Sequence, residues 1–397
     1  MKKNNRTPKL RFSRYTDDWE QRKFSELYAR SSEKNDGSIG MNKNITVATM
    51  QFKNDVKVSS AEYLKTYYTF NVGDIAFEGH QSKEFRYGRF VENDIGNGIV
   101  SHIFAVFKPI QEYDLYFWKY AINNEALMQR ILARSTKAST MMHDLVTNDF
   151  LNETFLVPSV DEQKQIGAFL NKLDHLIALH QRKLEKLQNM KKSCLQKMFP
   201  KDGATIPEIR FSEFQGDWEE RTLGSCFDER LESLPDGELL SVTIGSGIKK
   251  FSELDRHDNS NTDKSKYKRV CIGDIAYNSM RMWQGASGRS PYEGIVSPAY
   301  TVVKPIGDID TQFFAYMFKK KEIIHLFEIN SQGLTSDTWN LKYPAFSKIV
   351  VRVPRNVEEQ SRIARFLLEL DELISCTEQE IEITKRMKKG CLQKMFV

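Results

Sequence analysis

The residues best suited to chemistry in this sequence are hydrogen-bond donors and acceptors in glycine-containing loops. In the second half of the chain, one loop follows the run Ile-Gly-Asp-Ile-Ala-Tyr and carries Asn278, Ser279, Arg281, Trp283, Gln284 and, a little further on, Arg289. Arginine can pair bidentately with guanine, and asparagine or glutamine with adenine, so this mixture suits the reading of base edges in a DNA groove. The alternative is a solvated hairpin tip with a packed tryptophan.

An equivalent loop follows a similar run in the first half of the chain. Its candidates for contact with DNA are His80, Gln81, Lys83, Arg86, Tyr87 and Arg89. A further loop near Ser331 contributes Gln332, and its counterpart near Ser135 contributes Lys137. Loops on a rigid scaffold often carry function, which is the argument for treating these loops as binding candidates.

A cluster of basic residues in the second half could contact the phosphate backbone. Its members are Lys249, Lys250, Lys264, Lys266, Lys268 and Arg269. Phosphate contacts by lysine and arginine give salt-sensitive affinity for nucleic acid. Acidic residues are interspersed among them, so an ordinary charged surface is an equally good interpretation.

The sequence lacks the common catalytic and cofactor-binding motifs. It contains no GxxxxGK[ST] phosphate loop, no HExxH and no GxSxG. It has no Pro-Pro dipeptide, which the Asn/Asp-Pro-Pro-aromatic motif of adenine methyltransferases requires. The seven histidines are scattered without metal-ligand spacing. We therefore expect no catalytic residue, no metal site and no directly bound cofactor.

Composition indicates an ordinary globular protein. The hydrophobic fraction is 40% and the charged fraction 28%, while the net charge of +5 permits nucleic-acid binding without demanding it. Five cysteines without close pairs argue against a disulfide framework and against a CxxC metal site. The polar, basic opening predicts no signal peptide, and no apolar run approaches the length of a membrane span. We expect a cytoplasmic location.

An internal repeat covers nearly the whole chain. The opening Pro8-Lys-Leu-Arg-Phe-Ser returns as Pro207-Glu-Ile-Arg-Phe-Ser, and Asp-Trp-Glu begins five residues after the serine of each block. Gly-Asp-Ile-Ala, Gly-Ile-Val-Ser, Lys-Pro-Ile and Cys-Leu-Gln-Lys-Met-Phe each recur in the same order. The stretches between these blocks diverge. A common frame with different inserts suggests one architecture acting on two different targets.

The hydrophobic pattern predicts two mixed domains and two long helices. Residues 1–158 and 201–354 alternate short β-branched runs with turn residues and with helical patches at 115–133 and 311–327, which indicates an α+β domain in each. Residues 159–200 and 355–397 carry apolar residues at heptad spacing, including Ile166, Leu170, Ile363 and Leu367. We expect these two segments to form an antiparallel coiled coil between the globular domains, giving a pseudo-twofold repeat.

Taken together, these features resemble the specificity subunit of type I restriction–modification systems. The resemblance rests on the paired PxxRF openings, the VGDI and IGDI blocks at Val72 and Ile272, and the Gly-Ile-Val-Ser repeats at 98 and 294. It also rests on the Glu162-Gln163 and Glu359-Gln360 helix starts and the two CLQKMF ends. Each block alone is weak, but their order and double occurrence are specific.

The resemblance implies two target-recognition domains, each reading one half of a bipartite DNA site. It implies double-stranded DNA, two methyltransferase subunits and two translocase–endonuclease subunits as partners, with no membrane. S-adenosylmethionine, ATP and Mg would be used by those partners. The alternatives are a stand-alone DNA-modifying enzyme and a structural coiled-coil adaptor. The missing motifs disfavour the first, and the two dissimilar inserts disfavour the second.

Overall fold

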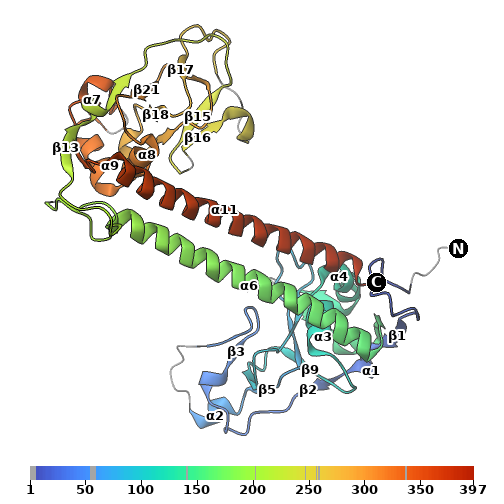
Figure 1. Cartoon of the computed structure of the whole chain (residues 1–397). Coiled ribbons are helices and arrows are strands. Elements are labelled where there is room, and N and C mark those ends of the chain that lie inside the picture. The colour runs from blue at the N-terminus through green and yellow to red at the C-terminus, as the bar shows by residue number, and fades with distance from the viewer. Residues whose placement is uncertain are drawn as a thin grey trace. The chain divides into compact units, whose positions relative to one another are not determined.

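The computed structural model describes residues 6–53, 60–139, 142–201, 203–245, 247–255, 257, 260–335 and 338–397. The chain forms two compact units (Figure 1). Unit 1 comprises Met1–Gln181 together with Gln379–Val397, and unit 2 comprises Arg182–Glu378. Each unit therefore combines one globular domain with a part of both long helices.

The centre of unit 1 is an antiparallel four-stranded sheet. Its order is β2 (Tyr28–Ser31), β9 (Ala105–Pro109), β6 (Ile75–Glu78) and β7 (Arg89–Glu92). Side chains alternate between its faces, as the pleat requires. Ile75 and Phe77 belong to the large aromatic core with Phe90 and Phe107, whereas Ala76 belongs to a smaller cluster on the other face.

Short strand pairs and helices complete unit 1. The pairs are β1 (Glu20–Lys23) with β12 (Thr154–Val157), β3 (Ile45–Thr46) with β4 (Gln51–Phe52), β5 (Tyr68–Phe70) with β8 (Gly98–Val100), and β10 (Thr136–Ala138) with β11 (His143–Leu145). The helices are α1 (Phe24–Leu27), η1 (Met41–Lys43), α2 (Ala61–Leu64), α3 (Leu115–Ile122), α4 (Glu125–Ser135) and α5 (Thr147–Asn152).

Unit 2 repeats this plan. Its four-stranded sheet runs β14 (Phe227–Glu229), β21 (Tyr300–Pro305), β18 (Ile275–Asn278) and β19 (Ser287–Arg289). The strand pairs are β13 (Glu219–Thr222) with β22 (Val350–Val353), β15 (Leu240–Thr243) with β16 (Gly247–Lys250), and β17 (Lys268–Val270) with β20 (Gly294–Val296). The short helices are α7 (Leu223–Cys226), η2 (Phe251–Glu253), η3 (Met282–Gln284), α8 (Thr311–Met317), α9 (Lys321–Ile329) and α10 (Tyr343–Phe346).

The predicted helical patches each divide into two helices. The patch at 115–133 breaks at Asn123 and Asn124 into α3 and α4, because the Asn124 side chain caps α4 by accepting a hydrogen bond from the Ala126 amide at 3.1 Å. The patch at 311–327 likewise becomes α8 and α9. These breaks matter for the site. Asn123, between α3 and α4, donates to the Phe90 carbonyl of the central sheet, and Lys319, between α8 and α9, donates to the Ser287 carbonyl.

The two long helices are confirmed. They are α6 (Val160–Lys197) and α11 (Val357–Lys394), each of 38 residues, drawn in green and red in Figure 1. Seam positions such as Ile166, Leu170, Ile363 and Leu367 are buried. In unit 1, Asp174 pairs with Lys388 and His180 pairs with Glu380. Residues later in α6 thus pair with residues earlier in α11. The helix segments in this unit are therefore antiparallel.

The motif residues at the helix starts attach the opening segments of each repeat to the helices. Arg11 donates from Nε and Nη2 to the two carboxylate oxygens of Glu162 at 2.7 and 2.8 Å. Arg210 does the same to Glu359, at 2.8 Å for both bonds. Both glutamates are buried. The repeated arginine and glutamate are thus a structural pair.

The repeated CLQKMF ends also pack within the units. Cys391, Met395 and Phe396 lie in the core of unit 1 with Trp19. Cys194 and Met198 take the same places in the core of unit 2. The interpretation of the two cysteines as small packing residues is confirmed. Across the residues described, no helix is long and apolar enough to cross a membrane.

Candidate DNA interface

In unit 1, the two candidate loops meet. The loop between β6 and β7 begins at Gly79, whose carbonyl accepts a hydrogen bond from the His143 amide of the β10–β11 hairpin at 2.8 Å. A Cβ at Gly79 would lie 2.1 Å from the His143 carbonyl oxygen, so only glycine permits this approach. His80 continues the contact through a bridge to Met142. We call residues 79–88 and 136–145 the first loop pair, of which 140 and 141 lie outside the described residues.

Most predicted residues of the first loop pair are exposed. His80, Gln81, Lys83, Arg86 and Lys137 all face solvent. Lys137 stands on β10 opposite Asp144. The structure therefore brings together side chains that come from two separate stretches of sequence. The surface they share offers several donors for base edges or phosphates.

Two predicted residues of unit 1 are engaged in packing. Arg89 Nε forms an ion pair with Glu78 at 2.7 Å, and its Nη2 donates to the Ala48 carbonyl at 2.7 Å. The Tyr87 ring makes an edge contact with the His143 ring at 5.4 Å between centroids. These contacts stabilise the base of the loop, so Arg89 and Tyr87 support the exposed residues of the loop.

Unit 2 has the same arrangement with different residues. The Leu341 amide donates to the Ser279 carbonyl at 2.8 Å, and Gln332 bridges to Asn340. The rings of Trp283 and Trp339 meet edge to face at 5.3 Å between centroids. These contacts join residues 279–286 to residues 331–341, of which 336 and 337 lie outside the described residues. We call the two segments the second loop pair.

The second loop is held by its own polar groups. Asn278 Oδ1 accepts from the Met280 amide at 3.0 Å, and Trp283 Nε1 donates to the Met280 carbonyl at 3.1 Å. Gly285 has φ of 81°, the left-handed conformation in which glycine is favoured. Arg281 is exposed, while Asn278, Trp283 and Gln284 are half-buried. Arg281 is thus the most accessible donor of this loop.

Two predicted residues of unit 2 are poorly placed for contact with DNA. Ser279 is buried, and its hydroxyl shares a hydrogen bond of 2.8 Å with that of Thr301. Arg289 pairs with Ile275 at the opposite end of β18 from the loop, and its Nε donates to the Thr311 hydroxyl at 3.0 Å. We therefore assign both to structural roles. Their place depends on the strand register, which the residue types did not indicate.

The predicted basic cluster is partly neutralised within unit 2. Lys268 lies 3.6 Å from a carboxylate oxygen of Glu229, and Arg269 lies 3.2 Å from Glu232. Two lysines lie over aromatic rings, Lys250 over Tyr292 and Lys264 over Tyr267. Lys249 is half-buried on β16, and Lys266 is exposed. These positions favour an ordinary charged surface over one continuous phosphate-binding patch.

Sequence reasoning missed Trp339 and His143, whose side chains complete the two loop pairs. His143 lies on β11 and Trp339 directly precedes Asn340, the bridge partner of Gln332, and nothing in their spacing indicated a partner in a distant loop. The only available signal was that Trp283 needed a surface to pack against.

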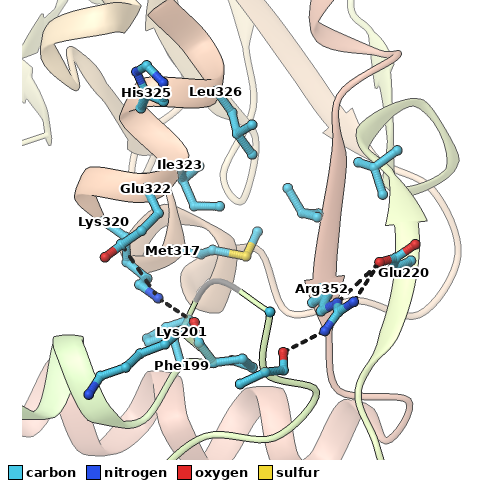
Figure 2. Close-up of a pocket in the computed structure, with 15 residues that line it drawn as sticks. Phe199, Lys201, Glu220, Met317, Lys320, Glu322, Ile323, His325, Leu326 and Arg352 are labelled. Atoms are coloured by element: carbon cyan, nitrogen blue, oxygen red, sulfur yellow. Dashed lines mark hydrogen bonds and ion pairs between the residues drawn. The ribbon is translucent and has the colours of Figure 1, made fainter.

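A cavity of about 310 Å³ in unit 2 lies beside the segment that follows α6 (Figure 2). Lys320 Nζ donates to the Pro200 carbonyl at 3.0 Å, and Arg352 donates to the Ala204 carbonyl at 2.6 Å while pairing with Glu220. These bonds fix the path of the chain from α6 into the domain. Within the part of the chain that is described, no group of three or more His, Cys, Asp and Glu residues could hold a metal ion.

Comparison with known proteins agrees with this architecture. Residues 16–189 match the family model of the type I restriction modification DNA specificity domain. The specificity subunit of the type I restriction enzyme MjaVIII from Methanocaldococcus jannaschii is 24% identical over 308 residues, which is 70% of this chain and 68% of that protein.

One solved structure shows the same fold. The S subunit of a type I restriction–modification system from M. genitalium superposes with a TM-score of 0.58 at 16% identity, covering 98% of this chain and 99% of that one. The HsdS subunit from Thermoanaerobacter tengcongensis gives a TM-score of 0.49 at 15% identity, covering 95% and 96%.

The fold thus consists of two similar units, each with a pair of contacting loops beside its four-stranded sheet. Residues 16–189 thus match the type I restriction modification DNA specificity domain, and the chain is similar to specificity subunits of type I restriction–modification systems.

Proposed function

We propose that this subunit reads a bipartite DNA target, with the first loop pair reading one half-site and the second loop pair reading the other. One observation carries the proposal. Each unit has an equivalent four-stranded sheet with a loop pair beside it, and the two loop pairs consist of dissimilar residues. The first presents Gln81, Lys83 and Arg86, and the second presents Arg281 beside a pair of tryptophans. A common scaffold with different donors is what two different half-sites require.

The proposal extends to the partners. Two methyltransferase subunits would modify adenine in the two half-sites, and two translocase–endonuclease subunits would carry out ATP-dependent cleavage. S-adenosylmethionine, ATP and Mg would be used by those subunits, and this chain would bind none of them directly. Two things support this division of labour: the family match and the absence of catalytic motifs from the sequence.

The long helices would set the distance between the two half-sites. A helix of 38 residues is about 57 Å long at 1.5 Å per residue. Half-sites read from one side of a duplex lie about 34–36 Å apart, or one helical turn. The helices are therefore long enough to separate two reading surfaces by that distance.

Two matched variants test the assignment of half-sites. The methylated motif is first determined by sequencing genomic DNA from cells that carry the system. The complex with the methyltransferase is then prepared with Arg86→Ala or Arg281→Ala, each an exposed arginine in one loop pair. Binding is measured to the target duplex and to duplexes altered in one half-site.

Each variant serves as the control for the other. We expect Arg281→Ala to reduce discrimination at one half-site by about tenfold, the loss of one bidentate base contact, and to leave the other half-site unchanged. Arg86→Ala should give the reciprocal result. A methylated motif without a gap, or a pair of variants that weaken the same half-site, would contradict the proposal.

A further inference from the structure

A half-buried lysine lies against residues 279–286 of the second loop pair, which we call the second reading loop. Lys319 follows α8, and its Nζ donates to three backbone carbonyls: Ile244 at 3.0 Å, Gly285 at 2.6 Å and Ser287 at 2.8 Å. An ammonium has three N–H donors and no acceptor, so these three carbonyls satisfy it completely. The lysine is therefore a fixed part of the loop's surroundings and is not available to bind DNA itself.

The three carbonyls belong to the segments that determine where the loop lies. Gly285 and Ser287 form the return of the loop from η3 into β19, where Gly285 adopts its left-handed conformation. Ile244 follows β15, in the turn of the neighbouring hairpin. The Lys319 side chain, which follows α8, thus joins the C-terminal end of the reading loop to the turn between β15 and β16.

The equivalent position of unit 1 makes a related bond. Asn123 lies nine residues after the helix-capping Asp114, as Lys319 lies nine after the capping Asp310. Its Nδ2 donates to the Phe90 carbonyl at 3.0 Å. Phe90 pairs with Phe77 on β6, as Ser287 pairs with Tyr277 on β18, so the two acceptors occupy the same register position.

The two units differ in how far the bond reaches. The shorter side chain of Asn123 makes one bond to the strand, and beyond it lies a cavity of about 790 Å³ that Asn123, Thr49 and Met50 help to line. In unit 2, Lys319 extends to three carbonyls. The position is shared by the two units, while the number of contacts is particular to each.

We infer that Lys319 is a positioning residue that fixes the second reading loop in the conformation that recognises its half-site, and that Asn123 has the weaker equivalent role in unit 1. This inference rests on the proposed function of the two loop pairs. The loop backbone carries Arg281 and Gln284, so a shift of its returning end displaces the donors that would meet the bases. Bidentate base contacts are lost with small displacements because both bonds must align.

The test uses the full chain in complex with its methyltransferase partner. Lys319→Met removes all three donors while keeping much of the side-chain volume. Lys319→Gln keeps an amide donor, the group that this chain uses at the equivalent Asn123. Asn123→Ala is the matched change in unit 1. Binding is measured to the target duplex and to duplexes altered in the first or the second half-site, with the melting temperature of each complex.

We expect Lys319→Met to lose about tenfold in discrimination at one half-site, as for one misaligned bidentate contact, with the other half-site and complex assembly unchanged. Lys319→Gln should recover part of that loss, and Asn123→Ala should affect only the opposite half-site. A general loss of stability would weaken both half-sites equally, and that result would overturn the inference.

The Arg281→Ala complex separates this inference from the proposed function. If Arg281→Ala loses discrimination and Lys319→Met keeps it, the loop reads DNA and Lys319 does not position it. If Arg281→Ala keeps full discrimination at both half-sites, the proposed function itself fails.

Discussion

At the scale of single residues, the bidentate pair of Arg210 and Glu359 explains a repeated motif and makes a testable prediction. Glu359 is buried and accepts two bonds from Arg210 and one from Trp218 Nε1 at 3.2 Å. Removing the arginine leaves a buried carboxylate without its charged partner, which costs about 3–5 kcal/mol. We expect Arg210→Met to lower the free energy of unfolding by that amount in urea titrations.

A matched arginine on the surface supplies the control. Arg362 pairs with Glu213 at 2.8 Å, but both side chains are nearly half exposed. Exposed pairs contribute only about 0–1 kcal/mol, so Arg362→Met should change stability little. Equal effects of the two substitutions would show that burial of Glu359 does not determine the strength of its pair.

Burial of Lys319 also predicts a dependence of stability on pH. Burial, with a smaller effect from the nearby charge of Lys191, lowers the pKa of Lys319 from its usual 10.5 to about 8. Between these values the unfolded chain binds a proton that the folded chain has released, so stability rises with pH. We expect the free energy of unfolding, measured relative to Lys319→Met, to increase between pH 8 and pH 10.5 and to be constant below pH 7. A flat difference across this range would contradict the lowered pKa.

The sequence predicted which segments form loops better than it predicted which of their residues are exposed. Arg, Asn and Gln beside glycine marked segments that are loops in the structure, because local composition indicates a loop. Whether a residue in that loop is exposed depends on strand register, which is set by partners far away in the chain. This is why Ser279 is buried beside Thr301 and why Arg289 lies at the far end of its strand.

At the scale of elements, the long helices were the most predictable feature, because the heptad spacing of apolar residues is a local pattern. Order within the sheets was not predictable, since β2, β9, β6 and β7 are brought together by non-local pairing. The break between α3 and α4 had a local signal in the capping Asn124, but the continuous apolar pattern of residues 115–133 obscured it.

The glycine at position 390 gives a prediction for α11. Gly390 lies inside the helix, and a Cβ there would have no atom within 4 Å. Glycine in a helix interior is about 1 kcal/mol less favourable than alanine. We expect Gly390→Ala to raise the free energy of unfolding of unit 1 by about that amount, measured by denaturant titration.

Gly79→Ala is the informative contrast to Gly390→Ala. Its Cβ would lie 2.1 Å from the His143 carbonyl oxygen, so the first loop pair must separate to accommodate it. Discrimination at one half-site should then fall while the helices remain intact. If Gly79→Ala leaves that discrimination unchanged, contact between the two loops is not needed for reading.

At the scale of the whole molecule, the proposed function gives each unit one reading surface, and α6 and α11 run through both units. The boundary between the units falls at Gln181 and Arg182 in α6 and at Glu378 and Gln379 in α11. Four residues inserted at each of these two places add slightly more than one helical turn, so the apolar seam stays nearly in phase. The added length is about 6 Å, which corresponds to between one and two base pairs of duplex.

We therefore expect the paired insertion to lengthen the unspecified gap of the methylated motif by one or two base pairs and to leave both half-sites unchanged. Sequencing of methylated genomic DNA from cells carrying the variant measures the gap directly. An insertion in α6 alone is the control, because it puts the two helices out of register and should reduce methylation altogether. A paired insertion that methylates the original motif with its original gap would show that the helices do not set the spacing, even if the loop pairs read the half-sites as proposed.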